Sequence, residues 1–281
     1  MAIISKPDGD FGPRIFIFIE NDIVLEKLTD QPVDDKDFLL TEEWLPKTQS
    51  LSSFIRDKKA CDWYRESSPD YCAAMLKKEC ELSPKFIKMP LRHFFWLTKK
   101  DRELCQLGSL AARAHGFLRL REDYKYCPTC GGNLEDDTFF AAKKCSKCGK
   151  LLFPRIEPAI IVLVSKGDEI LLAKNRNNGK GFYSCIAGFV EHGESAEQCV
   201  AREVMEETGL KVKNIRYAGS QAWPFPDQLM LAFYADYESG DIKIQEEELS
   251  DARWFKKDAL PPVPPPGSVA YSLISGICQL I

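Results

Sequence analysis

The second half of the chain carries short apolar runs whose length and spacing predict strands. Residues 159–164 form one uninterrupted apolar run. After a Lys-Gly-Asp turn, residues 169–173 form a returning segment that is apolar from Ile170 to Ala173. Runs of this length bounded by turn residues are typical of buried strands. By the same reasoning, further strands are expected at 182–187, 212–220, 229–237 and 252–255.

Local signals also predict where helices begin and end in this half. Ser195 and Gln198 have the spacing of a capping box, so we expect a helix over 196–207 that ends near Gly209. The proline-rich stretch 261–266 allows neither a helix nor a strand ladder, and a last helix is expected within 268–280. Strands interleaved with helices in this way indicate an α/β sandwich over residues 156–281.

The first 122 residues give weaker patterns. An apolar run at 14–19, a polar turn and a second short run at 23–25 predict a hairpin. Apolar positions recur at helical spacing within 101–120, which predicts an amphipathic helix. Residues 26–70 show no clear period, and nothing before residue 120 indicates a chemistry. We expect an N-terminal mixed α/β domain over residues 1–122.

Composition and charge narrow the class of protein. The chain has 281 residues, of which 44% are hydrophobic and 28% are charged, which is ordinary for a soluble globular protein. The net charge of −4 argues against a surface that coats nucleic acid, although bound metal ions would still allow an anionic substrate. No apolar run reaches the length of about 20 residues that spans a bilayer, and Met1–Asp10 lacks a secretion-signal pattern. We therefore expect a cytoplasmic protein with no membrane partner.

Two Cys-x-x-Cys pairs mark a compact module at residues 123–155. Cys127 and Cys130 are separated from Cys145 and Cys148 by 14 residues. Four thiolates at this spacing predict one tetrahedral structural Zn²⁺, and such a site has no open position for hydrolysis. A nucleic-acid-binding ribbon is the alternative, but residues 121–155 hold seven Lys or Arg and five Asp or Glu, which is only weakly basic.

The remaining cysteines are scattered along the chain. The total of 11 is odd, and no secretion signal is evident. We therefore expect the other seven to be reduced thiols that pack as small hydrophobes.

Three glutamates fall on one face of the predicted 196–207 helix. Glu203, Glu206 and Glu207 have the spacing i, i+3 and i+4. A purely structural helix would gain from lysine partners one turn away, whereas three neighbouring carboxylates repel one another. Mg²⁺ or Mn²⁺ would neutralise them, because both ions prefer oxygen ligands. Taken alone, the cluster would still be compatible with a solvated acidic face.

The sequence around these glutamates resembles the Nudix box. The matching positions are Gly188, Glu194, Arg202, Glu203, Val204, Glu206, Glu207, Gly209 and Leu210. The resemblance implies an α+β protein whose Nudix domain is an α/β/α sandwich preceded by the zinc ribbon and the N-terminal domain. It also implies that Glu203 and Glu207 bind Mg²⁺ or Mn²⁺, with Glu206 as ligand or base. Arg202 and Glu194 would orient the ligands, and the carbonyl of Ala187 would be a further one.

A second segment resembles the signature of the NADH pyrophosphatase subfamily. Residues 220–228 follow that pattern except at Ala222 and Gln228. Resemblance to this subfamily implies that Glu248 takes part in catalysis and metal binding. It also implies the substrate-binding residues listed below. Phe153 stands where the subfamily has Tyr, so it would stack but has no hydroxyl. The implied substrate-binding residues are Phe153, Phe189, Gln221, Trp223, Phe225 and, through its backbone, Ala270.

The resemblance implies a function as well as a site. Members of this subfamily hydrolyse NAD(H) to nicotinamide mononucleotide and AMP, remove NAD caps from RNA 5′ ends, and form homodimers. Two alternatives remain: a Nudix hydrolase for ADP-ribose or dinucleoside polyphosphates, and a zinc-ribbon regulator that senses a dinucleotide without cutting it. The intact set of three glutamates argues against the regulator, because a sensor does not need all three.

Overall fold

The protein is a mixed α+β chain that divides into two compact units, Met1–Arg155 and Ile156–Ile281. The computed structural model describes residues 14–27, 45, 63–68, 70–100, 104–176 and 181–276. Within these ranges no helix combines the length and the hydropathy needed to cross a membrane. The predicted fold class is confirmed, and each unit is described by itself.

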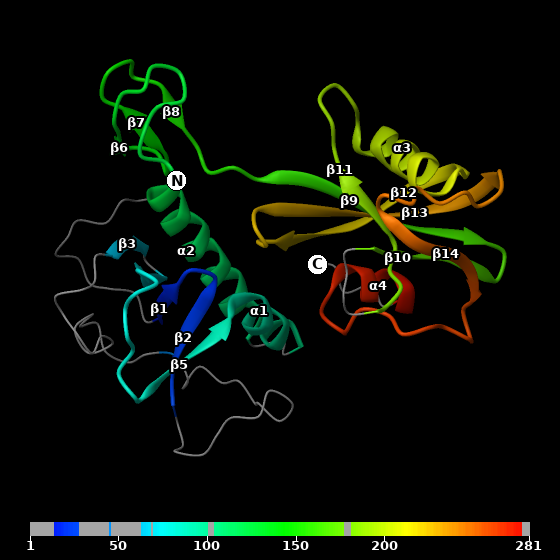
Figure 1. The fold of residues 1–281 in the computed structure, drawn as a ribbon, viewed down its shortest axis with the longest axis horizontal. Helices are drawn as coiled ribbons and strands as arrows, with labels where there is room; N and C mark the ends of the chain where they lie inside the picture. The colour runs from blue at the N-terminus through cyan, green and yellow to red at the C-terminus, as the bar shows by residue number, and fades with distance from the viewer. Residues whose placement is uncertain are drawn as a thin grey trace. The chain divides into compact units, whose positions relative to one another are not determined.

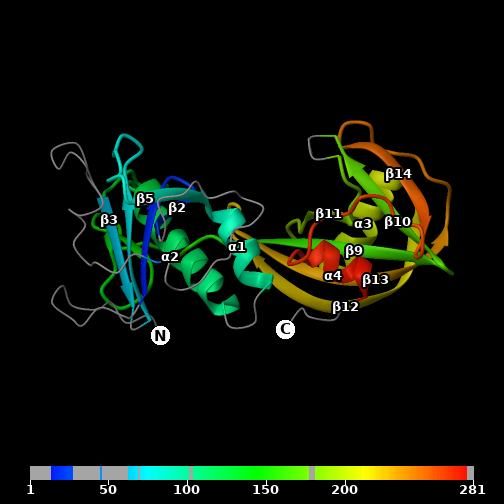
Figure 2. The same cartoon turned by 90° about the horizontal axis from the view of Figure 1, so that it is seen from below.

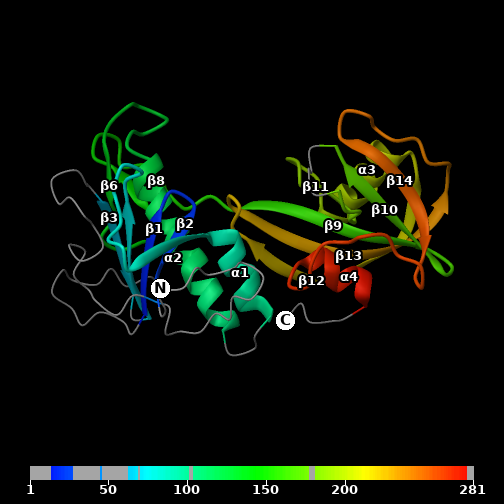
Figure 3. The ribbon, with the colours of Figure 1, turned by 60° about the horizontal axis from the view of Figure 1, so that its bottom comes forward.

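The first unit contains a five-stranded sheet with two helices. Its strand order is β3-β4-β1-β2-β5, and α2 contacts β3 and β4 (Figure 3). The predicted hairpin is confirmed as β1 and β2, and the predicted helix near 101–120 is confirmed as α2. The sequence did not predict the other elements of this unit. The elements are β1 (Arg14–Ile19), β2 (Asp22–Glu26), β3 (Trp63–Ser68), β4 (Tyr71–Leu76), β5 (Phe86–Pro90), α1 (Leu91–Lys100) and α2 (Cys105–Asp123).

The seven cysteines outside the module are expected to be buried, reduced thiols, and only some of them are. Cys185 and Cys199 are buried, whereas Cys72 and Cys105 are half-buried. Cys80 is buried but disulfide-bonded, so the expectation of a reduced thiol is wrong there. Cys61 and Cys278 lie outside the described residues.

The cysteine-rich module is a small antiparallel sheet at the end of the first unit. Its strands are β6 (Leu134–Asp136), β7 (Lys143–Cys145) and β8 (Leu151–Leu152), in that order. Each Cys-x-x-Cys turn closes on a glycine whose φ is positive, 68° at Gly131 and 75° at Gly149. The amide of each glycine donates to the carbonyl of the first cysteine of its pair, at 2.9 and 3.0 Å. Both turns therefore need a residue without a Cβ.

The second unit is built on a mixed six-stranded sheet. The path is β12-β13-β9-β10-β14, with β11 paired to β9. β9 pairs with β13 in parallel and with β10 and β11 antiparallel. The elements are β9 (Glu157–Lys166), β10 (Glu169–Asn175), β11 (Ile186–Phe189), α3 (Ala196–Thr208), β12 (Lys211–Trp223), β13 (Gln228–Ser239), β14 (Leu249–Lys256) and α4 (Val269–Ser275).

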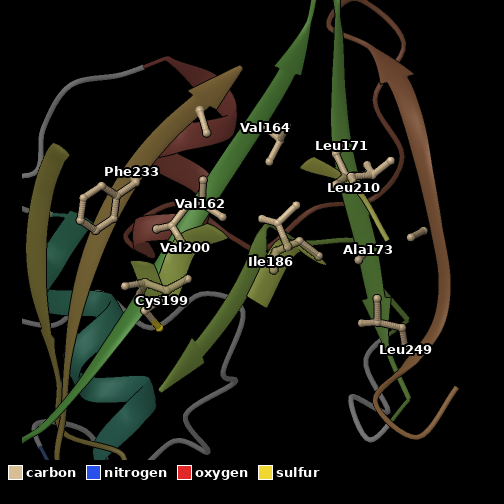
Figure 4. Close-up of a cluster of buried hydrophobic side chains, with 14 residues drawn as sticks. Val162, Val164, Leu171, Ala173, Ile186, Cys199, Val200, Leu210, Phe233 and Leu249 are labelled. Atoms are coloured by element: carbon tan, nitrogen blue, oxygen red, sulfur yellow. The ribbon is translucent and has the colours of Figure 1, made fainter. Parts of the chain in front are cut away.

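The apolar run of β9 is buried on both faces, which explains why it is continuous rather than alternating. One set of its side chains, including Val162, packs in a cluster with Val200 on α3 (Figure 4). The alternate set, including Ile161, packs with Leu273 on α4. The two helices thus lie on opposite faces of the sheet (Figures 1 and 2), as in the predicted sandwich.

Candidate active site

The capping signals of α3 fix where its glutamates stand. The Ser195 hydroxyl accepts a hydrogen bond from the Gln198 amide at 3.3 Å, and the Gln198 side chain accepts one from the Ser195 amide at 2.7 Å. Gly209 ends the helix in the left-handed region with φ 72°. Both predictions are confirmed. Because the helix begins and ends at set residues, its acidic face is held in one register.

Arg202 holds the acidic face to the loop before the helix. Its Nε and Nη2 donate to both carboxylate oxygens of Glu194 at 3.1 and 2.7 Å, and Nη2 also donates to the Phe189 carbonyl at 2.9 Å. Its Nη1 donates to Glu203 at 2.9 Å and to Glu206 at 3.0 Å. One guanidinium therefore orients three carboxylates, and such forked contacts restrict geometry more than a point charge would.

Glu194 is fixed as a carboxylate within this loop. Its partners are the Arg202 guanidinium and the backbone amide of Glu191, which donates at 2.7 Å. Arg202 first, and then the Glu191 amide, lower the pKa of Glu194 to about 2. Glu194 therefore holds Arg202 through an ion pair, and the orienting role at a metal site that the resemblance implies for the two residues stays a prediction.

Glu207 is a buried carboxylate without a compensating partner among the described residues. Its exposed fraction is 4%, and neither a hydrogen bond nor a salt bridge reaches its carboxylate there. Burial, followed by repulsion from Glu203, Glu248 and Glu206, raises its pKa to about 8. Glu248 is thus one of the acidic groups that act on Glu207, and the part in catalysis and metal binding that the resemblance implies for it stays a prediction. A buried carboxylate surrounded by carboxylates is costly unless a cation compensates it.

The donor set of this face suits hard divalent ions. Within the described ranges, the one group of acidic, His or Cys side chains that brings three or more ligand atoms within 4.8 Å is the cysteine set, so the glutamates form no closed cage. Mg²⁺ normally keeps several waters and takes only one or two protein carboxylates together with phosphate oxygens. The glutamate carboxylates along the open face of α3 suit this preference of Mg²⁺ for few protein ligands.

Gly188 lies directly beneath the Glu203 carboxylate. A Cβ at position 188 would stand 2.0 Å from both the carboxyl carbon and one oxygen of Glu203. The backbone of β11, which includes Ala187, is thereby brought next to the acidic face. Position 188 therefore needs a residue without a side chain, because a Cβ there would push the Glu203 carboxylate away.

Replacing Gly188 with Ala is expected to lower activity while leaving the fold intact. The clash meets the end of a flexible side chain, so Glu203 can rotate away. If Glu203 binds a catalytic metal ion, as the resemblance implies, this displacement is expected to reduce kcat/KM roughly 10- to 100-fold. Steady-state hydrolysis and thermal unfolding would measure the two effects. Gly116→Ala is the matched control, because a Cβ there meets nothing within 4 Å. Unchanged activity in Gly188→Ala would contradict the proposed position of Glu203.

The predicted substrate-binding residues of this unit fall into two places. Phe189 ends β11 and is half-exposed, and its carbonyl contacts Arg202. Trp223 and Ala270 belong to the apolar cluster on the α4 face, and the rings of Trp223 and Phe225 meet edge-to-face at 5.3 Å. This second group therefore lies on the sheet face opposite α3.

Gln221 joins β12 to the start of α4. Its Nε2 donates to the Gly267 carbonyl at 3.0 Å, and its Oε1 accepts from the Val269 amide at 2.9 Å. The backbone that leads to Ala270 is therefore set by this amide. Phe153 belongs to the other unit, where it is 56% exposed and contacts the ring of Phe140.

One contributor to the site has no sequence signal. Cys199, expected to be only a small buried hydrophobe, donates its thiol to the Phe189 carbonyl at 3.3 Å and contacts Nη2 of Arg202 at 3.4 Å. A lone cysteine inside a helix gives no indication of such a contact, so only the structure reveals it.

The four cysteines of the module fit a zinc ion. The Sγ atoms of Cys127 and Cys148 are 3.7 Å apart, those of Cys130 and Cys145 are 3.5 Å apart, and all four lie within 4.8 Å of one another. A Zn–S bond of about 2.3 Å in a tetrahedron requires sulfurs about 3.8 Å apart. The backbone amide of Thr129 lowers the pKa of Cys127 to about 6, whereas hydrogen bonds with Cys148 and Cys145 raise the pKa of Cys130 to about 12. A bound cation would favour the thiolate form of all four cysteines.

Known proteins resemble this chain, both over its second unit and over most of its length. The NUDIX domain family model matches residues 155–272. A Pseudomonas aeruginosa protein named NAD-capped RNA hydrolase NudC is 43% identical over 241 residues, which are 86% of this chain and 83% of that protein. A Photobacterium profundum protein of the same name is 50% identical over 62% of this chain and 66% of its own length. A solved NUDIX hydrolase from Nitrosomonas europaea is 24% identical, with a TM-score of 0.43 over 49% of this chain and 80% of that one.

Proposed function

Because this chain belongs to the Nudix hydrolase family, we propose that it hydrolyses the diphosphate linkage of NAD(H) and of NAD caps on RNA. The products would be nicotinamide mononucleotide and AMP, or an RNA with a 5′-monophosphate. The observation that carries the proposal is the acidic face of α3, where Glu203, Glu206 and Glu207 stand together under the control of Arg202. The relatives named as NAD-capped RNA hydrolases support this substrate class.

The residues of this face have separable roles in the proposed reaction. Bound Mg²⁺ or Mn²⁺ would neutralise the diphosphate, polarise phosphorus and lower the pKa of water. Glu203 and Glu207, with the Ala187 carbonyl, would hold the ions against β11. Glu206, Glu207 or Glu248 would take the proton of the attacking water. Arg202 keeps Glu203 and Glu206 in place through its hydrogen bonds.

The apolar groups would recognise the nucleotide halves. Trp223 and Phe225 offer two rings at one end of the β12–β13 hairpin, where a base or the nicotinamide would stack. Gln221 would act on the substrate by fixing the backbone at Ala270 as much as by direct contact. Phe189 is a further half-exposed aromatic residue of this unit that the resemblance assigns to the substrate. We further propose that the module binds zinc and that the enzyme is a homodimer, as the subfamily implies.

Product analysis tests the function directly. Purified protein with Mn²⁺ is expected to release nicotinamide mononucleotide from NADH and from NAD-capped RNA, and to cut ADP-ribose more slowly. The matched control is Glu207→Gln under the same conditions, which excludes a contaminating hydrolase. Faster hydrolysis of ADP-ribose than of either NAD substrate would contradict the substrate assignment. Tight NADH binding without any product would favour the dinucleotide sensor instead.

A further inference from the structure

The backbone carbonyl of Phe189 is held by two donors from α3. Phe189 is the last residue of β11, where it pairs with Ala159 of β9, and its side chain is 48% exposed. Its carbonyl accepts hydrogen bonds from Nη2 of Arg202 at 2.9 Å and from the thiol of Cys199 at 3.3 Å. A carbonyl oxygen has two lone pairs, so these two donors fill its acceptor capacity. The exposed ring is therefore carried on a fixed stretch of backbone.

The guanidinium of Arg202 has no donor left for a second bond to this carbonyl. A guanidinium carries five N–H groups, and here all of them are used. Their acceptors are both carboxylate oxygens of Glu194 and single oxygens of Glu203, Glu206 and Phe189. The second hydrogen bond to the Phe189 carbonyl therefore depends on the thiol of Cys199.

Cys199 is in a state that lets it donate. Its exposed fraction is 0%, and it lies with Val200 in the apolar cluster of the α3 face (Figure 4). Burial, followed by the neighbouring Glu194 carboxylate, raises the pKa of Cys199 to about 12, so the thiol keeps its proton at neutral pH. A buried thiol that keeps its proton can act as a hydrogen-bond donor but not as a nucleophile.

The two donors act on different parts of the proposed site. Arg202 holds the Phe189 carbonyl together with Glu203 and Glu206. Among the hydrogen bonds of the described residues, the Cys199 thiol donates to the Phe189 carbonyl and to none of the three glutamates of the acidic face. Loss of the guanidinium would disturb the glutamates and Phe189 together. Loss of the thiol would loosen the Phe189 carbonyl and leave the bonds from Arg202 to the glutamates in place.

We infer that Cys199 is a positioning residue for substrate binding, because its thiol fixes the Phe189 carbonyl and thereby the exposed Phe189 ring. This inference rests on the proposed function, in which Phe189 contacts the nucleotide. It deepens that function by separating substrate affinity from metal chemistry on one helix. A cysteine that served only as a small apolar residue would be replaceable by alanine without any effect on substrate binding.

Three variants of α3 test the role of the thiol. Cys199→Ala is expected to raise KM for NADH roughly two- to fivefold, as the loss of one weak hydrogen bond would. The value of kcat and the Mn²⁺ concentration for half-maximal activity are expected to stay unchanged. Cys199→Ser keeps a donor and is expected to retain the wild-type KM. Val200→Ala is the matched control, because it removes buried volume from the next position of the same cluster and is expected to lower thermal stability alone.

A double-mutant cycle shows whether Cys199 acts through Phe189. In a Phe189→Ala background the ring is absent, so Cys199→Ala is expected to raise KM no further. Equal increases with and without the ring would overturn the inference. So would an unchanged KM in Cys199→Ala, a Cys199→Ser variant as impaired as Cys199→Ala, or a changed Mn²⁺ requirement.

The same cycle on the Kd of NADH, measured by fluorescence titration in metal-free buffer, does not require cleavage. Non-additive losses of affinity are expected there as well, and additive ones would contradict the role of Cys199. A wild-type protein that binds NADH without cutting it would contradict the proposed function instead. The two failures are therefore distinguishable.

Discussion

Glu207→Gln is expected to lower kcat for NADH by at least about 10³-fold at saturating Mn²⁺. The substitution keeps the shape of the side chain but removes its charge, and electrostatic stabilisation by bound metal accounts for several kcal/mol of barrier reduction, each 1.36 kcal/mol being about tenfold. Saturating metal matters, because a simple loss of metal affinity would then be compensated. Single-turnover hydrolysis would separate the chemical step from product release.

Thermal unfolding of Glu207→Gln shows whether the variant is still folded. In metal-free buffer at neutral pH, Glu207→Gln is expected to unfold at the same temperature as the wild type or a higher one, because burial and three neighbouring glutamates oppose a charge at this position. Glu197→Gln is the matched control: Glu197 is exposed on the first turn of α3 and belongs to no proposed contact. Near-normal turnover of NADH by Glu207→Gln would contradict its assigned role.

The parts of the site that follow from sequence are those set by local rules. The register of Glu203, Glu206 and Glu207 depends only on helical spacing, and the ends of α3 depend on Ser195 and Gly209. These features involve residues within a few turns of one another, so the sequence displays them directly. The same holds for the cysteine pairs, whose tight turns require Gly131 and Gly149.

The features that the sequence conceals depend on contacts between distant segments. The strands β3–β5 contain polar residues and show no strict alternation, because their pattern reflects the whole first-unit sheet and its helices. The hydrogen bonds of Gln221 join positions 46 and 48 residues apart. The closeness of Gly188 to Glu203 likewise becomes visible only when β11 packs on α3.

The roles of the two proposed metal sites are expected to separate completely. The apolar cluster of the ribbon contains only three buried residues, Cys127, Leu134 and Cys145, and two of these are proposed zinc ligands. So small a core cannot offset the entropy of ordering the module. The second unit, in contrast, has buried clusters on both faces of its sheet. Zinc should therefore stabilise the ribbon, whereas the Nudix unit should fold without it.

Cys148→Ser is expected to lose the zinc ion and to unfold residues 123–155. Binding of structural zinc contributes about 10–16 kcal/mol to the folding of zinc-finger peptides. The few buried apolar contacts of this module contribute far less free energy. Zinc content per chain and limited proteolysis would measure the loss, with cleavage expected within the ribbon and the Nudix unit left intact. Cys105→Ser, a half-buried cysteine outside the ribbon, is the matched control. A Cys148→Ser protein that keeps zinc, or a ribbon that resists protease without it, would contradict a structural metal.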